Sequence, residues 1–266
     1  MKILVIGDVV GSPGRSIMKK ALPHVFREHD VDYCIANVEN AAGGFGVTKE
    51  VCDEIRDLGV DCMTSGNHIW DKKEILPWIA QIPELLRPAN YPSGQPGRGS
   101  HVGKGKDSGV LVATLNLSGR VFMNGAIDDP FQVGKAEAER LRKEARIVIV
   151  DMHGEATSEK MAIAHYLDGL VTAVVGTHTH VPTCDQRLLA KGTAFCSDIG
   201  MTGPYDSVIG VEPEAVIQRF VTGMPTRFET AKGDPRLAAV VIDADPKSGR
   251  ARSIDRLLLS ESDLPA

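Results

Sequence analysis

The stretch KILVIGDVVGSPGRSIMKKALPHVFREH, residues 2–29, joins an apolar run of strand length to an amphipathic run of helix length. The same succession follows twice more: DYCIANV (32–38) precedes TKEVCDEIRDLG (48–59), and VDCMTS (60–65) precedes DKKEILPWIAQI (71–82). Strands that alternate with helices are typical of a parallel sheet, because a parallel pair needs a crossover connection. The first half of the chain is therefore predicted to be α/β, with helices that begin near Ser12 and at Thr48.

The second half of the chain adds antiparallel pieces to this pattern. We expect a pair of strands over 109–123 that turns at 118–119, strands over 146–154 and 171–180, helices over 133–145 and 158–169, and hairpins turned at 191–192 and 246–249. Residues 87–109 are rich in Gly, Pro and Ser and are predicted to form a long surface loop, either a lid or a simple excursion. The sheet is therefore expected to be mixed. Since neither repeats nor an interdomain linker is visible, a single domain over residues 1–266 is favoured.

The composition is that of an ordinary globular protein. Of the 266 residues, 24% are charged and 42% hydrophobic, and the net charge is -5. This acidic balance disfavours binding to long nucleic acid, which normally needs a basic face, but leaves a single nucleotide open. No apolar run approaches the roughly 20 residues of a membrane span, and the N-terminus lacks the pattern of a signal peptide. The five cysteines show no CxxC spacing, which favours reduced thiols and a cytoplasmic location.

Five of the apolar runs stop at residues that can bind a metal ion. These residues are Asp8, Glu39, Asn40, Asn67, His68, His153, His178 and His180. Ligands of open α/β sheets bind at the carboxyl ends of the strands, where residues distant in sequence meet. One such residue alone is more often a helix cap or a satisfied polar group than a ligand. Five strand ends with the same property indicate a metal or catalytic site.

The residue types restrict the metal. Imidazole, carboxylate and amide oxygen together suit Mn, Fe, Zn or Co, and the absence of cysteine from this set disfavours a structural zinc site. These eight residues exceed the needs of one ion, whereas two ions that share a bridging carboxylate would use seven of them. The sequence has no GxGxxG, P-loop, HExxH or GxSxG motif, which argues against dinucleotide-binding folds, P-loop enzymes, HExxH proteases and serine hydrolases.

The order of these residues resembles that of the calcineurin-like metallophosphoesterases: Asp8, Glu39, GNH at 66–68, His153 and GTHTH at 176–180. Two departures narrow the resemblance. Val10 stands where that superfamily usually has the histidine of an Asp-x-His motif, and Glu39 stands where it has the aspartate of a Gly-Asp motif. With GNHIWD (66–71) and SDIGMTGP (197–204), these changes resemble the bacterial YmdB-like subgroup, whose members are described as dinuclear phosphodiesterases that act on 2′,3′-cyclic nucleotides.

The resemblance implies an α/β fold of the α/β/β/α kind, in which two mixed β-sheets form a sandwich flanked by α-helices, as one metallophosphoesterase domain. It also implies two divalent or transition metal ions, with Fe or Mn favoured and Zn or Co as alternatives. By the same resemblance, Asp8 and His180 bind the first ion with help from Asn40, Glu39 bridges both ions, and Asn67, His153 and His178 bind the second. His68 is then the general acid and no ligand.

The activity that the resemblance implies is hydrolysis of 2′,3′-cyclic nucleotides. A metal-bridging hydroxide would attack in line, and His68 would protonate the departing 2′-oxygen to leave a 3′-phosphate. A broader phosphomonoesterase or nuclease on the same metal core is one alternative. A regulatory or RNA-binding protein with a vestigial site is another, although such a protein should have lost some of the ligands.

Arg15 and Asp198 are weaker candidates for substrate binding. Arg15 lies one turn into the first helix, where it could meet a phosphate, or it is an ordinary surface arginine. Asp198 lies in a glycine-rich segment that follows the histidine pair. The expected partners are a small phosphodiester substrate and, by general prevalence among soluble enzymes, further copies of the chain; no membrane partner is expected.

Overall fold

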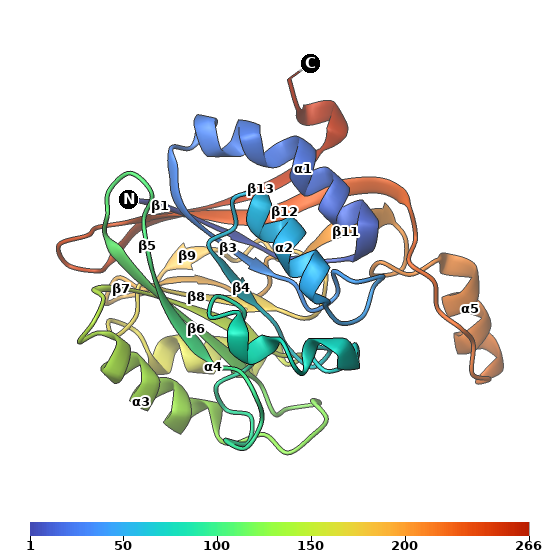
Figure 1. Ribbon diagram of the computed structural model, residues 1–266, viewed down its shortest axis with the longest axis horizontal. Helices are drawn as coiled ribbons and strands as arrows, with labels where there is room; N and C mark the ends of the chain where they lie inside the picture. The colour runs from blue at the N-terminus through green and yellow to red at the C-terminus, as the bar shows by residue number, and fades with distance from the viewer. Residues whose placement is uncertain (266) are drawn as a thin grey trace.

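The computed structural model describes residues 1–265, whose strands form two sheets that face each other (Figure 1). Within this range, one sheet has seven strands in the order β2-β11-β12-β1-β3-β4, with β13 beside β12. Its strands are β1 (Lys2–Ile6), β2 (Asp8–Val9), β3 (Val31–Asn37), β4 (Cys62–Thr64), β11 (Met201–Asp206), β12 (Gly233–Ala244) and β13 (Ala251–Ser260). The other sheet has six strands in the order β5-β6-β7-β8-β10-β9 over the same range. These strands are β5 (Ser100–Lys104), β6 (Leu111–Ser118), β7 (Ile147–His153), β8 (Ala173–Thr177), β9 (Arg187–Leu188) and β10 (Ala194–Cys196).

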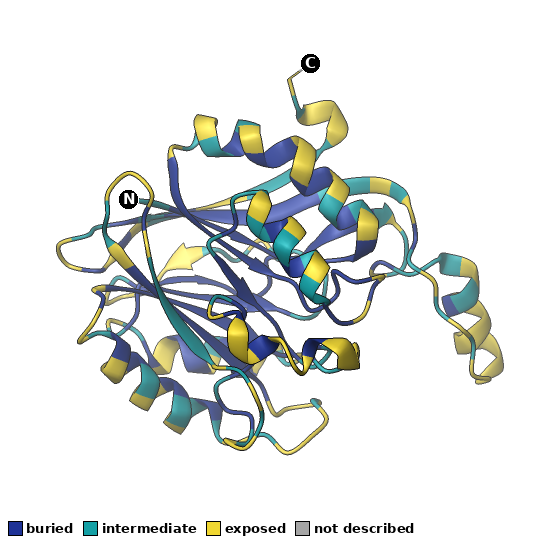
Figure 2. Cartoon of the chain, viewed as in Figure 1, coloured by how far each residue is buried: buried dark blue, intermediate teal, exposed yellow. Residues whose placement is uncertain are grey.

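Helices cover the outer face of each sheet. The seven-stranded sheet is covered by α1 (Gly11–Glu28) and α2 (Lys49–Asp57), and the six-stranded sheet by α3 (Pro130–Leu141) and α4 (Thr157–Tyr166). Figure 2 shows that the helices bury the side that faces a sheet and expose the side that faces solvent, as their amphipathic sequences require. The predicted α/β/β/α sandwich of two mixed sheets is therefore confirmed.

Alternation along the central strands explains why their sequences are continuously apolar. In β1, Ile3 and Val5 pack between the two sheets, whereas Leu4 and Ile6 pack under the helices α1 and α2. Successive side chains of a strand point to opposite faces, and both faces of β1 are covered. The mixed character is also confirmed: β1, β3 and β4 are parallel to one another, and β12 runs antiparallel to β1.

Two expected elements were wrong. The helix predicted over 71–82 is replaced by two 3₁₀ turns, η1 (Lys73–Ile75) and η2 (Ile79–Gln81), because Pro77 has no N–H for a continuous helix and its ring obstructs one. The second strand predicted in 109–123 does not form. The Glu159 carboxylate instead accepts the N–H groups of Arg120 and Val121, so the chain turns away from the sheet after β6.

The remaining expectations were met in part. Both late hairpins are confirmed, as β9 with β10 and as β12 with β13. The segment 87–109 is not wholly a loop, because β5 lies within it and pairs antiparallel with β6. The strand β11 and the helix α5 (Pro213–Thr222) were not predicted, and α5 projects from the body of the molecule (Figure 1). Among residues 1–265, no helix combines the length and the apolar character that crossing a bilayer requires.

Candidate metal centre

The candidate centre lies where strand ends from both sheets meet. Asp8 follows β1, Glu39 and Asn40 follow β3, Asn67 and His68 follow β4, His153 ends β7, and His178 and His180 follow β8. The loop after β4 lies directly against β7, since a Cβ atom on Gly66 would be 2.1 Å from Cδ2 of His153. Glycine at position 66 therefore permits the two sheets to bring their ligand candidates together.

His153 is the centre of one half of the cluster. Its Nε2 atom lies 2.9 Å from Oδ1 of Asn67, 3.0 Å from Nδ1 of His178 and 3.1 Å from Oε1 of Glu39. The ligand atoms of Glu39, His153 and His178 all lie within 4.8 Å of one another. A single N–H cannot serve three acceptors well, whereas a cation among these atoms would satisfy all of them. These residues are the bridging carboxylate and the three ligands expected for the second ion.

A buried hydroxyl fixes the tautomer of His153. The Thr177 hydroxyl donates to Oδ1 of Asp151 at 2.7 Å, so its oxygen can only accept from Nδ1 of His153, 3.0 Å away. The proton of the neutral imidazole therefore lies on Nδ1, and the lone pair on Nε2 faces the cluster. Carboxylates and hydroxyls behind a histidine commonly fix the tautomer of a metal ligand in this way.

Asp8 and Asn40 each present a buried oxygen to the other half of the cluster. Oδ2 of Asp8 accepts the N–H of His178 at 3.1 Å, and the Asn40 amide donates to the carbonyl of Gly44 at 2.8 Å. Within the described part of the chain, Oδ1 of Asp8 and Oδ1 of Asn40 have no hydrogen-bond partner. Buried oxygens without partners are costly, and a divalent cation would satisfy both.

His180 completes this half. Its Nδ1 donates to the carbonyl of Ile209 at 2.8 Å, which leaves Nε2 as the nitrogen available to a metal. His180 and Asn40 line the same cavity, together with Glu39 and His178. The donor set of carboxylate, amide oxygen and imidazole therefore fits the two ions expected from the sequence.

The electrostatics of the cluster favour bound positive charge. Burial raises the pKa of the Asp8 carboxyl to about 6. Burial opposes charge on Glu39 and on His153, but their mutual attraction outweighs it, lowering the pKa of Glu39 to about 2 and raising that of His153 to about 9. Burial and the neighbouring His153 lower the pKa of His178 to about 3, so this imidazole is neutral, and its Nδ1 faces Nε2 of His153.

His68 is oriented differently from the ligand candidates. Its backbone N–H donates to Oε2 of Glu39 at 2.9 Å, and its Nδ1 lies 2.8 Å from Oδ2 of Asp71. The ring packs edge-on against Phe45, with 5.1 Å between ring centroids. Because Asp71 occupies Nδ1, Nε2 is the nitrogen left to face a ligand in the adjoining cavity. This arrangement agrees with a group that exchanges a proton with substrate.

The two weaker candidates lie outside the cluster. The Arg15 guanidinium contacts Oε2 of Glu54 at 2.7 Å and the carbonyl of Ala41 at 2.5 Å, so it ties α1 to α2 and to the loop after β3. Asp198 is buried behind the histidine pair, where its carboxylate accepts the N–H and the hydroxyl of Thr179. Substrate binding by Arg15 and by Asp198 stays a prediction.

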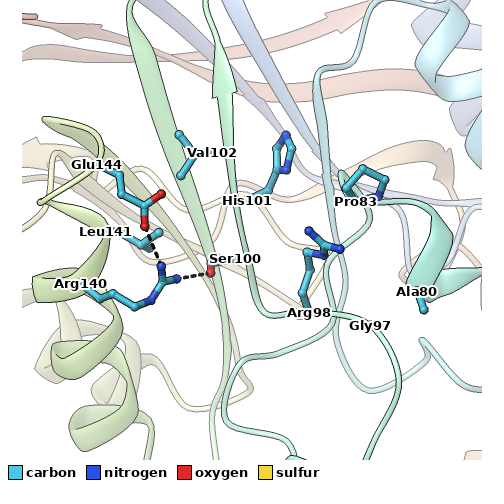
Figure 3. A pocket seen from close by; sticks show the side chains of 10 residues that line it. All are labelled: Ala80, Pro83, Gly97, Arg98, Ser100, His101, Val102, Arg140, Leu141 and Glu144. Carbon is cyan, nitrogen blue, oxygen red and sulfur yellow. Dashed lines mark hydrogen bonds and ion pairs between the residues drawn. The ribbon is translucent and has the colours of Figure 1, made fainter.

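A cavity of about 320 Å³ adjoins the cluster. Glu39, Asn40, His68, His178 and His180 line it from one side, and Phe45, Ile209, Val211 and Phe228 supply apolar walls. A larger cavity, of about 610 Å³, lies between β5, α3 and the turn η2 (Figure 3). Among the described residues, its walls include none of the predicted ligands, and the charge of its Arg140 is balanced by Glu144. The smaller cavity is therefore the candidate substrate site, because predicted ligands line it.

The two-sheet sandwich and the ligand cluster at its strand ends are those of a calcineurin-like metallophosphoesterase. The sequence profile of the YmdB-like protein family matches residues 4–257. The chain therefore belongs to the YmdB-like family.

Named relatives and solved structures agree with this assignment. The chain is 46% identical to the 2′,3′-cyclic-nucleotide 2′-phosphodiesterase of Bacillus subtilis, over 98% of each chain. A solved structure described as a hypothetical protein from Thermus thermophilus matches with a TM-score of 0.90 and 42% identity, over 98% of this chain and 100% of that one. A structure described as a novel phosphatase from Mycoplasma pneumoniae matches with a TM-score of 0.91 and 33% identity, over 98% and 93% of the chains. The expectation of an enzyme that hydrolyses phosphoric esters is thereby confirmed.

Proposed function

We propose that the protein, as a single metallophosphoesterase domain, is a dinuclear metal-dependent phosphodiesterase that converts 2′,3′-cyclic nucleotides to 3′-phosphates. The main support is the cluster itself. Among the described residues, Asp8 and Asn40 each have a buried oxygen without a hydrogen-bond partner. Asn40, His178 and His180 line a cavity of about 320 Å³. The activity named for the Bacillus subtilis relative supplies the substrate class. The cavity is at the small end of ligand pockets, which suits a mononucleotide better than a long strand.

The ligands divide into two sets around Glu39. Asp8, Asn40 and His180 would hold one ion, Asn67, His153 and His178 the other, and Glu39 would bridge them. When bound, two divalent ions lower the pKa of a water and offset the negative charge of the phosphate. The mixture of imidazole, amide and carboxylate suits Mn, Fe, Zn or Co, and the resemblance to the YmdB-like subgroup favours Fe or Mn among them.

His68 supplies the proton that the leaving group needs. Its Nδ1 is held by Asp71 at 2.8 Å, so the protonated ring would donate to the leaving group from Nε2, and the neutral ring that remains would keep its proton on Nδ1. For His68 to act as the acid, the departing 2′-oxygen would have to lie on its side of the cavity, opposite the attacking oxygen. Phe45 and Phe228 stand on the cavity wall and can pack against the base, since stacking on aromatic rings tolerates any base.

A substrate panel tests the proposal. We expect metal-loaded protein to prefer 2′,3′-cyclic AMP over bis(p-nitrophenyl) phosphate, and to hydrolyse p-nitrophenyl phosphate least. Preference for the mono-ester, or for single-stranded RNA, would favour the broader phosphomonoesterase or nuclease. Protein that carries its full complement of metal and turns over none of these substrates would support the regulatory alternative.

We also propose that the protein forms homo-oligomers through α5. This helix exposes Ile217, Phe220 and Val221 by 57%, 84% and 79%. With Met224, such side chains on two copies would bury roughly 1,000 Å², near the lower limit for a specific interface. A second copy suits this surface because each copy contributes the same apolar helix to a two-fold contact.

Light scattering after size-exclusion chromatography tests the oligomer. Phe220→Ser should lower the molar mass, and Gln218→Ser on the same helix should not. A wild-type monomer, or an unchanged mass for Phe220→Ser, would contradict the interface.

We further propose a cytoplasmic location, which the free cysteines support.

A further inference from the structure

The two histidines after β8 have an unusual backbone. The φ angles of His178 and His180 are 104° and 65°, in the left-handed region that side chains other than glycine seldom occupy. Such a conformation persists only where surrounding contacts enforce it. Its effect here is that the imidazole of His178 reaches His153, whereas that of His180 reaches the carbonyl of Ile209.

Thr179, between the two histidines, is held from behind by one carboxylate. Oδ2 of Asp198 accepts the N–H of Thr179 at 3.0 Å and its hydroxyl at 2.8 Å. Oδ1 of Asp198 accepts the N–H of Gly200 at 2.9 Å, so the carboxylate is itself fixed in the loop before β11. Both hydrogen-bond donors of Thr179 are therefore bound to Asp198, which fixes the residue between the two histidines.

A buried lysine on α4 completes the arrangement. Nζ of Lys160 lies 2.9 Å from Oδ2 of Asp198 and 3.2 Å from the carbonyl of Thr177. The side chains of Lys160 and Asp198 are 1% and 2% exposed. Lysine is almost never this buried unless it is paired, and a buried pair fixes geometry more than it adds stability. The pair touches the chain on both sides of His178.

We propose that Lys160 and Asp198 are positioning residues that hold the turn 178–180 in its metal-binding conformation. They act through Thr179 and through the carbonyl of Thr177, and neither is a metal ligand. The consequence is that the two histidines are directed to different ions before any metal binds, so no ordering of the turn is needed on binding. This inference rests on the proposed dinuclear centre.

The test compares variants of Thr179 and Asp198 in the full-length protein. Thr179→Val keeps the shape but removes the hydroxyl donor, Thr179→Ser restores it, and Asp198→Asn removes the charge that faces Lys160. Ile163→Ala is the matched control, because Ile163 lies on the same helix as Lys160 but packs between α4 and the sheet. The readouts are the affinity for Mn²⁺ by chelator competition, the absorption spectrum of the Co²⁺-loaded protein and the Tm without metal.

We expect Thr179→Val and Asp198→Asn to bind metal about 10- to 100-fold more weakly, with an altered Co²⁺ spectrum. Thr179→Ser should bind as the wild type does, and Ile163→Ala should lower Tm without changing affinity. If Asp198→Asn does not fold, the comparison of Thr179→Val with Thr179→Ser alone tests the proposal.

Wild-type affinity and spectrum in the folded Thr179→Val variant would overturn the positioning role. Equal loss of affinity in Ile163→Ala would do the same, since general instability would then explain the effect. Wild-type protein that binds metal but hydrolyses no cyclic nucleotide would refute the proposed substrate and leave the positioning role standing. Wild-type protein that binds no metal would refute both.

Discussion

Replacing Thr177 by valine should weaken the metal site without changing its shape. The hydroxyl of Thr177 joins Nδ1 of His153 to Oδ1 of Asp151, and all three residues are buried. Valine leaves an imidazole N–H and a carboxylate oxygen without this partner. Asn37 cannot replace the hydroxyl for the N–H of His153, because the amide nitrogen it presents there is itself a donor.

The magnitude follows from the two groups left unsatisfied. Each buried polar group without a partner costs about 1–3 kcal/mol, so the free energy of unfolding of the metal-free protein should fall by about 2–6 kcal/mol. The metal should bind about 10- to 100-fold more weakly, because Nδ1 of His153 no longer has an acceptor that fixes the ring and its tautomer. Thr177→Ser is the control: it keeps the hydroxyl and loses one methyl group, a cost of about 1 kcal/mol.

Two measurements check this prediction. Urea unfolding of chelated protein gives the free energy of unfolding, and competition with a chromophoric chelator gives the metal affinity. If Thr177→Val matches the wild type in affinity and in urea midpoint, the tautomer argument for His153 is refuted. If Thr177→Ser loses as much affinity as Thr177→Val, the hydroxyl is not the cause.

Two further predictions concern the site. His68→Ala should retain both metals and lose roughly 10²- to 10⁴-fold in kcat, whereas Glu39→Ala should lose metal and activity together. Metal analysis and steady-state kinetics of each variant check both predictions. The acid role of His68 is wrong if His68→Ala is depleted of both ions but keeps the wild-type activity per bound ion. Gly66→Ala should lower metal content, because the new Cβ would lie 2.1 Å from Cδ2 of His153, and Gly94→Ala, where a Cβ meets nothing within 4 Å, should not. Equal metal content in the two alanine variants would show that the ring of His153 can move aside.

The positions of the candidate ligands could be predicted because strand ends are visible in the sequence. Asp8, His153 and His178 each stand where an apolar run stops, and parallel strands bring such positions together. The strand pattern did not reveal that the ends come from two sheets, since sheet membership depends on contacts distant in sequence. The resemblance to metallophosphoesterases, and not the periodicity, supplied the sandwich.

The groups behind the ligands could not be predicted. Asp151 and Thr177 lie inside strands, and Lys160 lies in a helix, where a single polar residue in an apolar run gives no sign of its partner. Asn37 and Asp151 are hydrogen-bonded across the two sheets although 114 residues separate them. Only the folded arrangement shows that such residues support the site.

Some errors over secondary structure had a visible cause and others did not. Pro77 lies in the middle of the expected helix 71–82 and should have outweighed its periodicity. For α5, Pro213 at the first turn and Gly223 beyond the end are standard signals that were present in the sequence. The missing strand after β6 had no such sign, because it depends on Glu159, which lies 39 residues later than Arg120.

We propose above that two metal ions in this site support hydrolysis of a 2′,3′-cyclic nucleotide. The most direct test is to count the metal ions per chain and identify the product of 2′,3′-cyclic AMP, before chelation, after chelation and after metal is restored. We expect two ions per chain, 3′-AMP as the product, and activity that is lost and regained with the ions. Undiminished hydrolysis by protein that carries no metal would contradict it.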